Sequence, residues 1–186
     1  MIPTEHRHAW PFDEVFPVLN EPTIVEHASQ PYLAIRMVVA MSEIRSAADT
    51  LPAELAAWMQ ARGIAPAGPP FFKYNVIGSE GMELEWGVSV APPGKMGHIE
   101  GDGRVHAGTL PAGHYATLVH TGPYEDLRNA TGALLKWVAD RHRRIDARKT
   151  KAGEKFGGRF EVYLTDPRQQ PDSAQWRTAI AIRLAD

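Results

Sequence analysis

The clearest candidate for chemistry is one carboxylate, Glu161, inside the apolar stretch "GGRFEVYLTDP". Alternation along a β-strand divides this stretch into two faces, one of Phe160, Val162 and Leu164 and one of Glu161, Tyr163 and Thr165. We expect the first face to be the core under a helix, and the second to look away from that helix. We expect no lysine or arginine next to Glu161 on its own local strand face.

A buried carboxylate without a partner costs roughly several kcal/mol, so Glu161 must be protonated, hydrogen-bonded, ion-paired, or open to water and ligands. A cationic, largely apolar ligand would supply the missing charge. At about 4 Å and an effective dielectric of about 20 the attraction is on the order of 4 kcal/mol before desolvation, and aromatic walls add roughly 0.5–2 kcal/mol. The alternative is an ordinary edge strand with one polar face in water.

Other polar residues give weaker signals. The chain has eight histidines, but His98, His106, His114, His120 and His142 show no HExxH or comparable spacing, and His6 and His8 lie near the N-terminus. We therefore expect no metal site. The glycines of "GRVHAGTLPAG" lack the spacing of a phosphate-binding loop, and we expect no cofactor. Tyr115 and His120, on opposite faces of a predicted strand over 104–120, are both candidate ligand contacts.

Two charged groups have competing interpretations. Glu83 and Glu85 share a strand face opposite Leu84 and Trp86, which favours solvated carboxylates, with a second acidic group near the ligand as the alternative. The run from Arg141 to Lys155 contains seven basic residues. It is typical of a solvated helix end that continues into a mobile loop. A lid over the site and a contact for an acidic partner are the alternatives.

The elements that must position these residues follow from periodicity. Residues 23–41 predict one bent strand or two short ones, and Leu55, Trp58 and Met59 predict a helix that ends at Gly63. Strands are predicted over 71–77, 82–90, 104–120, 159–165 and 175–184. A second helix is predicted over 123–142, with a buried stripe of Leu127, Thr131, Leu134 and Val138.

This order repeats itself. Leu55 and Trp58 match Leu134 and Trp137 at an offset of 79, while Tyr74 and Trp86 match Tyr163 and Trp176 at offsets of 89 and 90. The offset maps Glu161 onto Phe72, so Phe72 and Tyr74 join Glu161 and Tyr163 as predicted walls of a cavity. The predicted fold class is α+β: duplicated strand-helix-strand-strand units with pseudo-two-fold symmetry, antiparallel sheets, helices on the outer face and a central ligand cavity.

Length, composition and net charge restrict the number of domains and the classes of partner. The chain has 186 residues, 44% of them hydrophobic, which suits one domain over residues 23–186, with repeats at about 23–92 and 104–186, preceded by a proline-rich arm over 1–22. The net charge of −2 argues against a nucleic-acid or membrane partner. The absence of cysteine and of any signal-peptide or membrane-spanning run predicts a soluble, cytoplasmic protein.

Four motifs in order, "GPPFFKY", "MELEWGVSV", "LPAGHYATLVHTGPYEDLRNATGALLKWV" and "FEVYLTDP", resemble the GyrI-like small-molecule-binding domain, which also forms the effector-binding half of AraC-type and MerR-type regulators. The resemblance runs from about Thr23 to the C-terminus. It implies a central site for lipophilic and often cationic compounds, with the acidic ligand-facing residue at Glu161 and aromatic walls at Tyr163, Phe72 and Tyr74. Trp86 and Ser89 depart from the family pattern, which usually has a small or aliphatic residue and a proline there.

The resemblance implies a stand-alone sensor or sink for small lipophilic or cationic molecules. Trp86 is a further candidate ligand contact, and we expect no DNA-binding segment in this sequence. The alternative is a hydrolase that opens cyclopropane-containing natural products, with Glu161 as general base and Tyr163 stabilising the developing charge. A third possibility is a modulator of a topoisomerase. The sequence names no protein partner.

Overall fold

The structure is a computed structural model that describes residues 21–91 and 101–186. Nearly all of the expected arm over 1–22 lies outside these ranges, as do His6, His8 and His98. The elements are β1 (Thr23–His27), β2 (Gln30–Val39), η1 (Met41–Glu43), α1 (Ile44–Gln60), β3 (Pro70–Ile77), β4 (Met82–Ser89), β5 (Val105–Leu110), β6 (Gly113–Thr121), η2 (Tyr124–Asp126), α2 (Leu127–Asp140), β7 (Ala147–Thr150), β8 (Gly153–Phe156), β9 (Arg159–Tyr163), η3 (Ser173–Gln175) and β10 (Arg177–Arg183).

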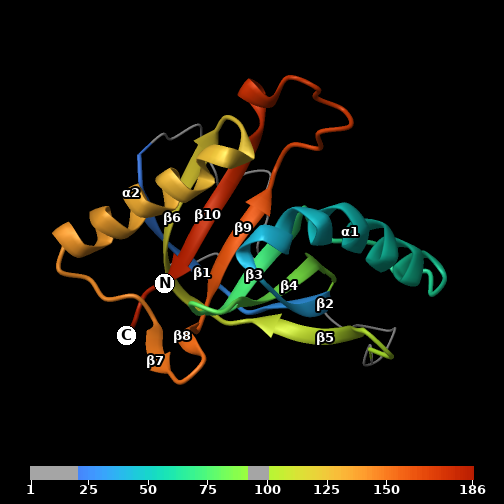
Figure 1. The fold of residues 1–186 in the computed structure, drawn as a ribbon, viewed down its shortest axis with the longest axis horizontal. Helices are drawn as coiled ribbons and strands as arrows, with labels where there is room; N and C mark the ends of the chain where they lie inside the picture. The colour runs from blue at the N-terminus through green and yellow to red at the C-terminus, as the bar shows by residue number, and fades with distance from the viewer. Residues whose placement is uncertain (1–20, 92–100) are drawn as a thin grey trace, which may run out of the picture.

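The strands form one antiparallel sheet in the order β1-β6-β10-β9-β3-β4-β2-β5, with the β7–β8 hairpin attached to β3 (Figure 1). This order is symmetric about the β9–β3 pair, where Phe72 lies opposite Glu161. These two residues are 89 positions apart, which is the predicted offset, so the pseudo-two-fold axis passes between them. The expected duplicated α+β fold is therefore confirmed, with its two halves joined edge to edge.

An arginine lies over a tryptophan ring at the C-terminal end of each helix. Arg62 lies 4.0 Å from the ring centre of Trp58, and Arg141 lies 3.9 Å from that of Trp137. The two stacked pairs have the same spacing along their helices and are related by the offset of 79. Trp86, however, has a different counterpart from the one predicted. It lies opposite Phe72 on β3, and Glu161 lies opposite Ile180, so Ile180 takes the place that the sequence offset gave to Trp176.

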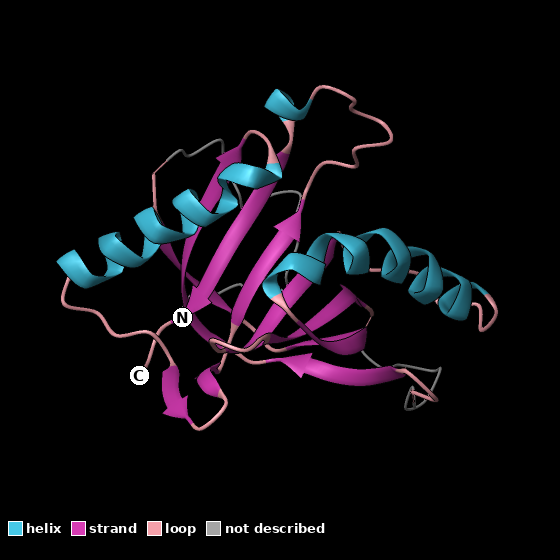
Figure 2. Cartoon of the chain, viewed as in Figure 1, coloured by secondary structure: helices cyan, strands magenta, loops and turns pink. Residues whose placement is uncertain are grey.

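Both helices lie on the same face of the sheet and flank its middle (Figure 2). Under α1, Leu55 and Met59 pack with Leu33 and Leu84. Under α2 the predicted stripe is buried as expected: Leu127, Thr131, Leu134 and Val138. On the other face the sheet curls around a third cluster, which draws Phe71 from the first half and Phe160 from the second.

Several predicted elements divide. Residues 23–41 form two strands, and β1 and β2 join opposite halves: β1 pairs with β6, while β2 pairs with β4 and β5. The strand expected over 104–120 also breaks, between Leu110 and Gly113, where Pro111 intervenes and Gly113 has a φ of 141°. The loop expected in the basic run was wrong, because Ala147–Phe156 contains the β7–β8 hairpin.

Within the described residues, no helix is long and apolar enough to cross a membrane.

Candidate functional site

Glu161 and Tyr163 lie on the helix-covered face of the sheet, at the seam between the two halves. Tyr163 packs against both helix-covered clusters, the one under α1 and the one under α2. The expectation that this face looks away from the helices was wrong. Alternation divided the strand correctly, but the face of Phe160 and Val162 is buried by the curl of the sheet instead of by a helix.

Glu161 is 9% exposed, and two phenols hold its carboxylate. The Tyr74 hydroxyl donates to Oε2 at 2.6 Å, and the Tyr163 hydroxyl donates to the same oxygen at 3.3 Å. Within the described chain no hydrogen bond ends on Oε1. A ligand that enters here therefore meets an oriented carboxylate with one oxygen still available.

Burial raises the pKa of Glu161, and the hydrogen bond from Tyr74 and the charge of Arg159 oppose that rise. Burial also raises the pKa values of Tyr74 and Tyr163 well above their ordinary range, and the neighbouring carboxylate adds to the effect. Both phenols therefore stay protonated and act as hydrogen-bond donors.

Arg159 corrects the prediction that no cation shares this strand face. It lies two residues before Glu161 on β9, so its side chain points the same way. Its guanidinium carbon lies 5.2 Å from the ring centre of Tyr74 and 4.9 Å from that of Phe156. The spacing of two residues was present in the sequence and should have identified it.

Several of the predicted wall residues lie close together at the seam. The ring centres of Phe72 and Trp86 are 4.9 Å apart, and those of Phe72 and Tyr163 are 6.1 Å apart. Trp86 and Tyr163 stack with an interplanar angle of 28°. Phe72, Tyr74, Trp86, Glu161 and Tyr163 thus form one group, with contributions from β3, β4 and β9.

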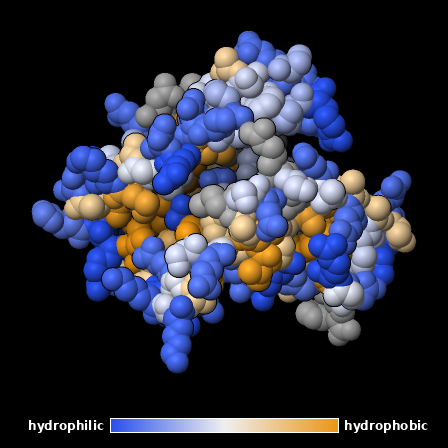
Figure 3. Space-filling view, in the orientation of Figure 1, coloured by the Kyte–Doolittle hydropathy of each residue, from blue (hydrophilic) through white to orange (hydrophobic). Residues whose placement is uncertain are grey.

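Sequence reasoning missed two aromatic residues of this group. Tyr124 of η2 packs edge-on against Tyr163 with ring centres 5.3 Å apart, and Trp176 lies 4.5 Å from Tyr124. The proline before Tyr124 was interpreted only as a helix start, because the sequence pattern does not show how the beginning of this helix packs against the seam. Figure 3 shows the surface hollowed near this end of the seam, between the start of α2 and α1.

Two other predicted contacts lie elsewhere. Tyr115 is fully buried on the opposite face, where its hydroxyl donates to the Pro111 carbonyl at 2.7 Å. His120 lies on the helix-covered face, with its Nε2 3.3 Å from the Pro123 carbonyl oxygen. Tyr115 therefore lies on the other side of the sheet from Glu161, and the ligand contacts of both residues stay predictions.

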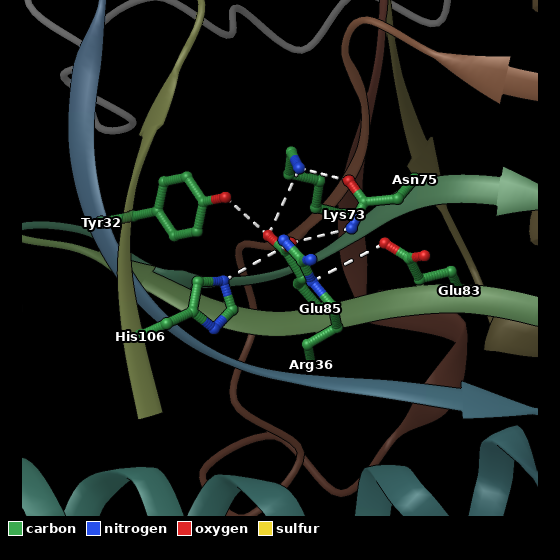
Figure 4. A network of polar contacts seen from close by, with 7 residues as sticks. All are labelled: Tyr32, Arg36, Lys73, Asn75, Glu83, Glu85 and His106. Atoms are coloured by element: carbon green, nitrogen blue, oxygen red, sulfur yellow. Dashed lines mark hydrogen bonds and ion pairs between the residues drawn. The ribbon is translucent and has the colours of Figure 1, made fainter. Parts of the chain in front are cut away.

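The predicted solvated state of Glu85 was wrong, because this residue has no exposed surface. Its carboxylate accepts hydrogen bonds from Tyr32 at 2.5 Å, from Arg36 at 2.6 Å and from Asn75 at 2.8 Å (Figure 4). Lys73 Nζ lies 3.3 Å away, and His106 Nε2 lies 3.5 Å away. Burial alone would raise the pKa of Glu85, but Lys73 and the donated hydrogen bonds outweigh it and lower that pKa to about 2. This network occupies the curled face, behind the aromatic wall.

No group of three or more His, Cys, Asp or Glu side chains in the described ranges has the arrangement of a metal site.

The fold is that of a small-molecule-binding domain of known type. Residues 20–185 match the GyrI-like small molecule binding domain, and the chain belongs to this family. The C-terminal domain of EcmrR has the same fold, with a TM-score of 0.67 and 23% identity over 89% of this chain and 98% of that domain. Against the EcmrR chain in its DNA complex, the TM-score is 0.69 and this chain spans 57% of that chain's length.

More distant structures share the fold. SAV2435 bound to tetraphenylphosphonium is similar at a TM-score of 0.61 and 12% identity, over 89% of this chain and 94% of that one. A hydrolase from Listeria innocua is similar at 0.58 and 13% identity, over 89% and 92%. A comparison with curated proteins found no match.

Proposed function

We propose that this protein binds lipophilic cations at the seam between its halves, as a cytoplasmic sink or sensor. The observation that carries the proposal is Glu161, a nearly buried carboxylate whose Oε2 is held by two phenols while Oε1 receives no hydrogen bond from the described chain. Holding one oxygen fixes the direction of the other without neutralising its charge. A ligand cation would then replace the water that burial removes.

The aromatic group supports the same ligand class. Phe72, Trp86 and Tyr163 offer ring faces and edges around the carboxylate, and a cation at an aromatic face gains roughly 0.5–2 kcal/mol. Large apolar surfaces on the ligand would gain about 25 cal/mol per Å² removed from water. Membership of the family supports the binding of a small molecule without specifying its class. The similar structure of SAV2435 contains tetraphenylphosphonium, which is a lipophilic cation.

The test compares two ligands of similar shape, methyltriphenylphosphonium and neutral triphenylphosphine oxide. Glu161→Gln keeps the acceptor for Tyr74 and Tyr163 but removes the charge. We expect it to weaken the phosphonium at least about tenfold, equivalent to about 1.4 kcal/mol, and to leave the oxide nearly unchanged. Isothermal titration calorimetry measures both. Equal losses for the two ligands would show that charge is not the recognition element.

A second candidate function uses the same groups for hydrolysis. Glu161 would take a proton from water as the water oxygen bonds to an electrophilic cyclopropane carbon. The electrons of the breaking C–C bond would move to a conjugated carbonyl oxygen, which would accept a hydrogen bond from Tyr74 or Tyr163, and the proton held by Glu161 would then pass to this enolate. The raised pKa values keep both phenols neutral, so that they would stabilise the developing charge as hydrogen-bond donors.

Catalysis predicts multiple turnovers of a cyclopropane-bearing alkylating compound by the purified protein, measured as ring-opened product by mass spectrometry. Glu161→Ala should abolish the product. Binding without product by the unmodified protein would leave only the receptor function.

A further inference from the structure

Arg159 lies beside Glu161 in a position that the cation-binding function does not explain. In the register of β3 and β9, Glu161 lies opposite Phe72 and Phe160 lies opposite Lys73, so the next step places Arg159 opposite Tyr74. Its guanidinium lies against two rings, those of Tyr74 and Phe156. Tyr74 therefore contacts a cation at its ring and a carboxylate at its hydroxyl.

The guanidinium lacks the partner that such a group normally has. Arg159 is half-buried, and an arginine in such a position usually satisfies some of its five N–H donors on carboxylates or carbonyls. In the part of the chain that the structure describes, Arg159 has ring contacts but no side-chain hydrogen bond or ion pair. Burial lowers the pKa of Arg159, which is the direction expected for a cation short of acceptors. Stacking holds the flat group and leaves its edge available for a planar acceptor.

The two charges also break the symmetry of the seam. The offset of 89 relates Glu161 to Phe72 and Arg159 to Pro70, so the first half has only apolar residues where the second half has a carboxylate and a guanidinium. A ligand across the seam therefore meets charge from one half only. Along β9, two residues separate the Cα atoms of Glu161 and Arg159 by roughly 7 Å.

We propose that Arg159 forms an anion-accepting subsite next to Glu161. The preferred ligands are then amphipathic molecules with a cationic group and a nearby carboxylate or similar planar acceptor. This inference rests on the proposed function of Glu161, and it narrows the ligand class from simple cations to zwitterions. Arg159 would contact the ligand directly, while Tyr74 separates the two charged groups.

The test uses rhodamine B, which has a free carboxylate, and its ethyl ester, which has the same cationic chromophore. Arg159→Met should weaken rhodamine B at least about tenfold, while the ester binds unchanged or more tightly because Glu161 loses a competing cation. Arg159→Lys keeps the charge but not the planar group, and should give an intermediate loss. Arg148→Met, an exposed arginine of β7, makes the same change in net charge and should alter neither dye. Fluorescence anisotropy measures all four proteins.

The outcomes separate the two proposals. Equal changes for both dyes in Arg159→Met, or binding of the ester alone by the unmodified protein, would overturn the subsite while leaving the cation site intact. If neither dye binds, the cation proposal fails, and 2-naphthalenesulfonate then tests Arg159 alone. If 2-naphthalenesulfonate binds to the unmodified protein and to Glu161→Gln but not to Arg159→Met, the result supports the subsite. If it does not bind to the unmodified protein, the subsite is overturned. Circular dichroism of each variant establishes that it is folded.

Discussion

At the residue scale, burial of the Glu161 carboxylate lowers the stability of the ligand-free protein and favours the binding of a cation. Burial raises the pKa of Glu161 and so disfavours the ionised carboxylate, which is the form that a cationic ligand needs. A raised pKa in the folded state contributes stability that is present at low pH and is lost as pH rises through the folded-state pKa. At neutral pH the free protein therefore carries a cost that a cation relieves.

This cost predicts that Glu161→Gln is more stable than the unmodified protein at pH 7. The gain is about 1.4 kcal/mol for each unit by which the folded-state pKa exceeds the unfolded one, and it shrinks as pH falls. Urea unfolding at a series of pH values measures it. Over the same pH range, the affinity of the unmodified protein for the phosphonium should decrease as the pH is lowered through the pKa of Glu161. The affinity of Glu161→Gln should not change with pH. A less stable Glu161→Gln at pH 7 would contradict this account.

At the element scale, the β3–β4 pair carries the aromatic wall on one face and the Glu85 network on the other. Lys73 lies between Phe72 and Tyr74 and is the cross-strand partner of Glu85, which precedes Trp86. The network therefore ties together the backbone positions from which three wall residues project. Its cations and hydrogen-bond donors more than offset the burial of the carboxylate, as the low pKa of Glu85 indicates.

Glu85→Gln should destabilise the fold by about 3–5 kcal/mol at pH 7, because it leaves the mostly buried Lys73 without its counter-charge. The pKa of Glu85 is lowered in the folded state, so its contribution is present above about pH 4.5 and is lost as pH falls toward about 2. The matched control is Glu83→Gln on the same strand, whose side chain is 33% exposed and lies 3.6 Å from Arg36. We expect less than about 1 kcal/mol for the control. Similar losses at pH 7 and pH 2.5 would argue against an electrostatic role.

The same elements show what the sequence could predict. Alternation placed Glu161 with Tyr163 and grouped Phe72 with Tyr74, and helical periodicity identified the stripe from Leu127 to Val138. Alternation says which residues share a face, but not what covers that face. Because the curl of the sheet depends on contacts between distant strands, the burial of Glu85 could not be predicted from β4 alone. Tyr124 reaches the seam for the same reason, through the packing of α2.

At the scale of the whole molecule, the two halves are joined by a short seam and a shared core. The β3–β9 register covers three residue pairs, fewer than the five between β9 and β10. On the curled face, however, the rings of Phe71 and Phe160 meet with centres 6.0 Å apart. The clusters under α1 and α2, by contrast, are centred on separate halves, with Ile35 in one and Ile182 in the other. Energetic coupling between the halves should therefore run mainly through the curled face.

This arrangement predicts two different double-mutant cycles, both measured by urea unfolding. Ile35→Val and Ile182→Val should each cost about 0.5–1.5 kcal/mol and add to within about 0.5 kcal/mol, because they lie in separate clusters. Phe71→Leu and Phe160→Leu lie in contact across the seam and should show an interaction energy of about 0.5–3 kcal/mol. If the isoleucine pair coupled and the phenylalanine pair added, the halves would communicate through the helix-covered face. Ligands bound beside Glu161 would then be part of that coupling.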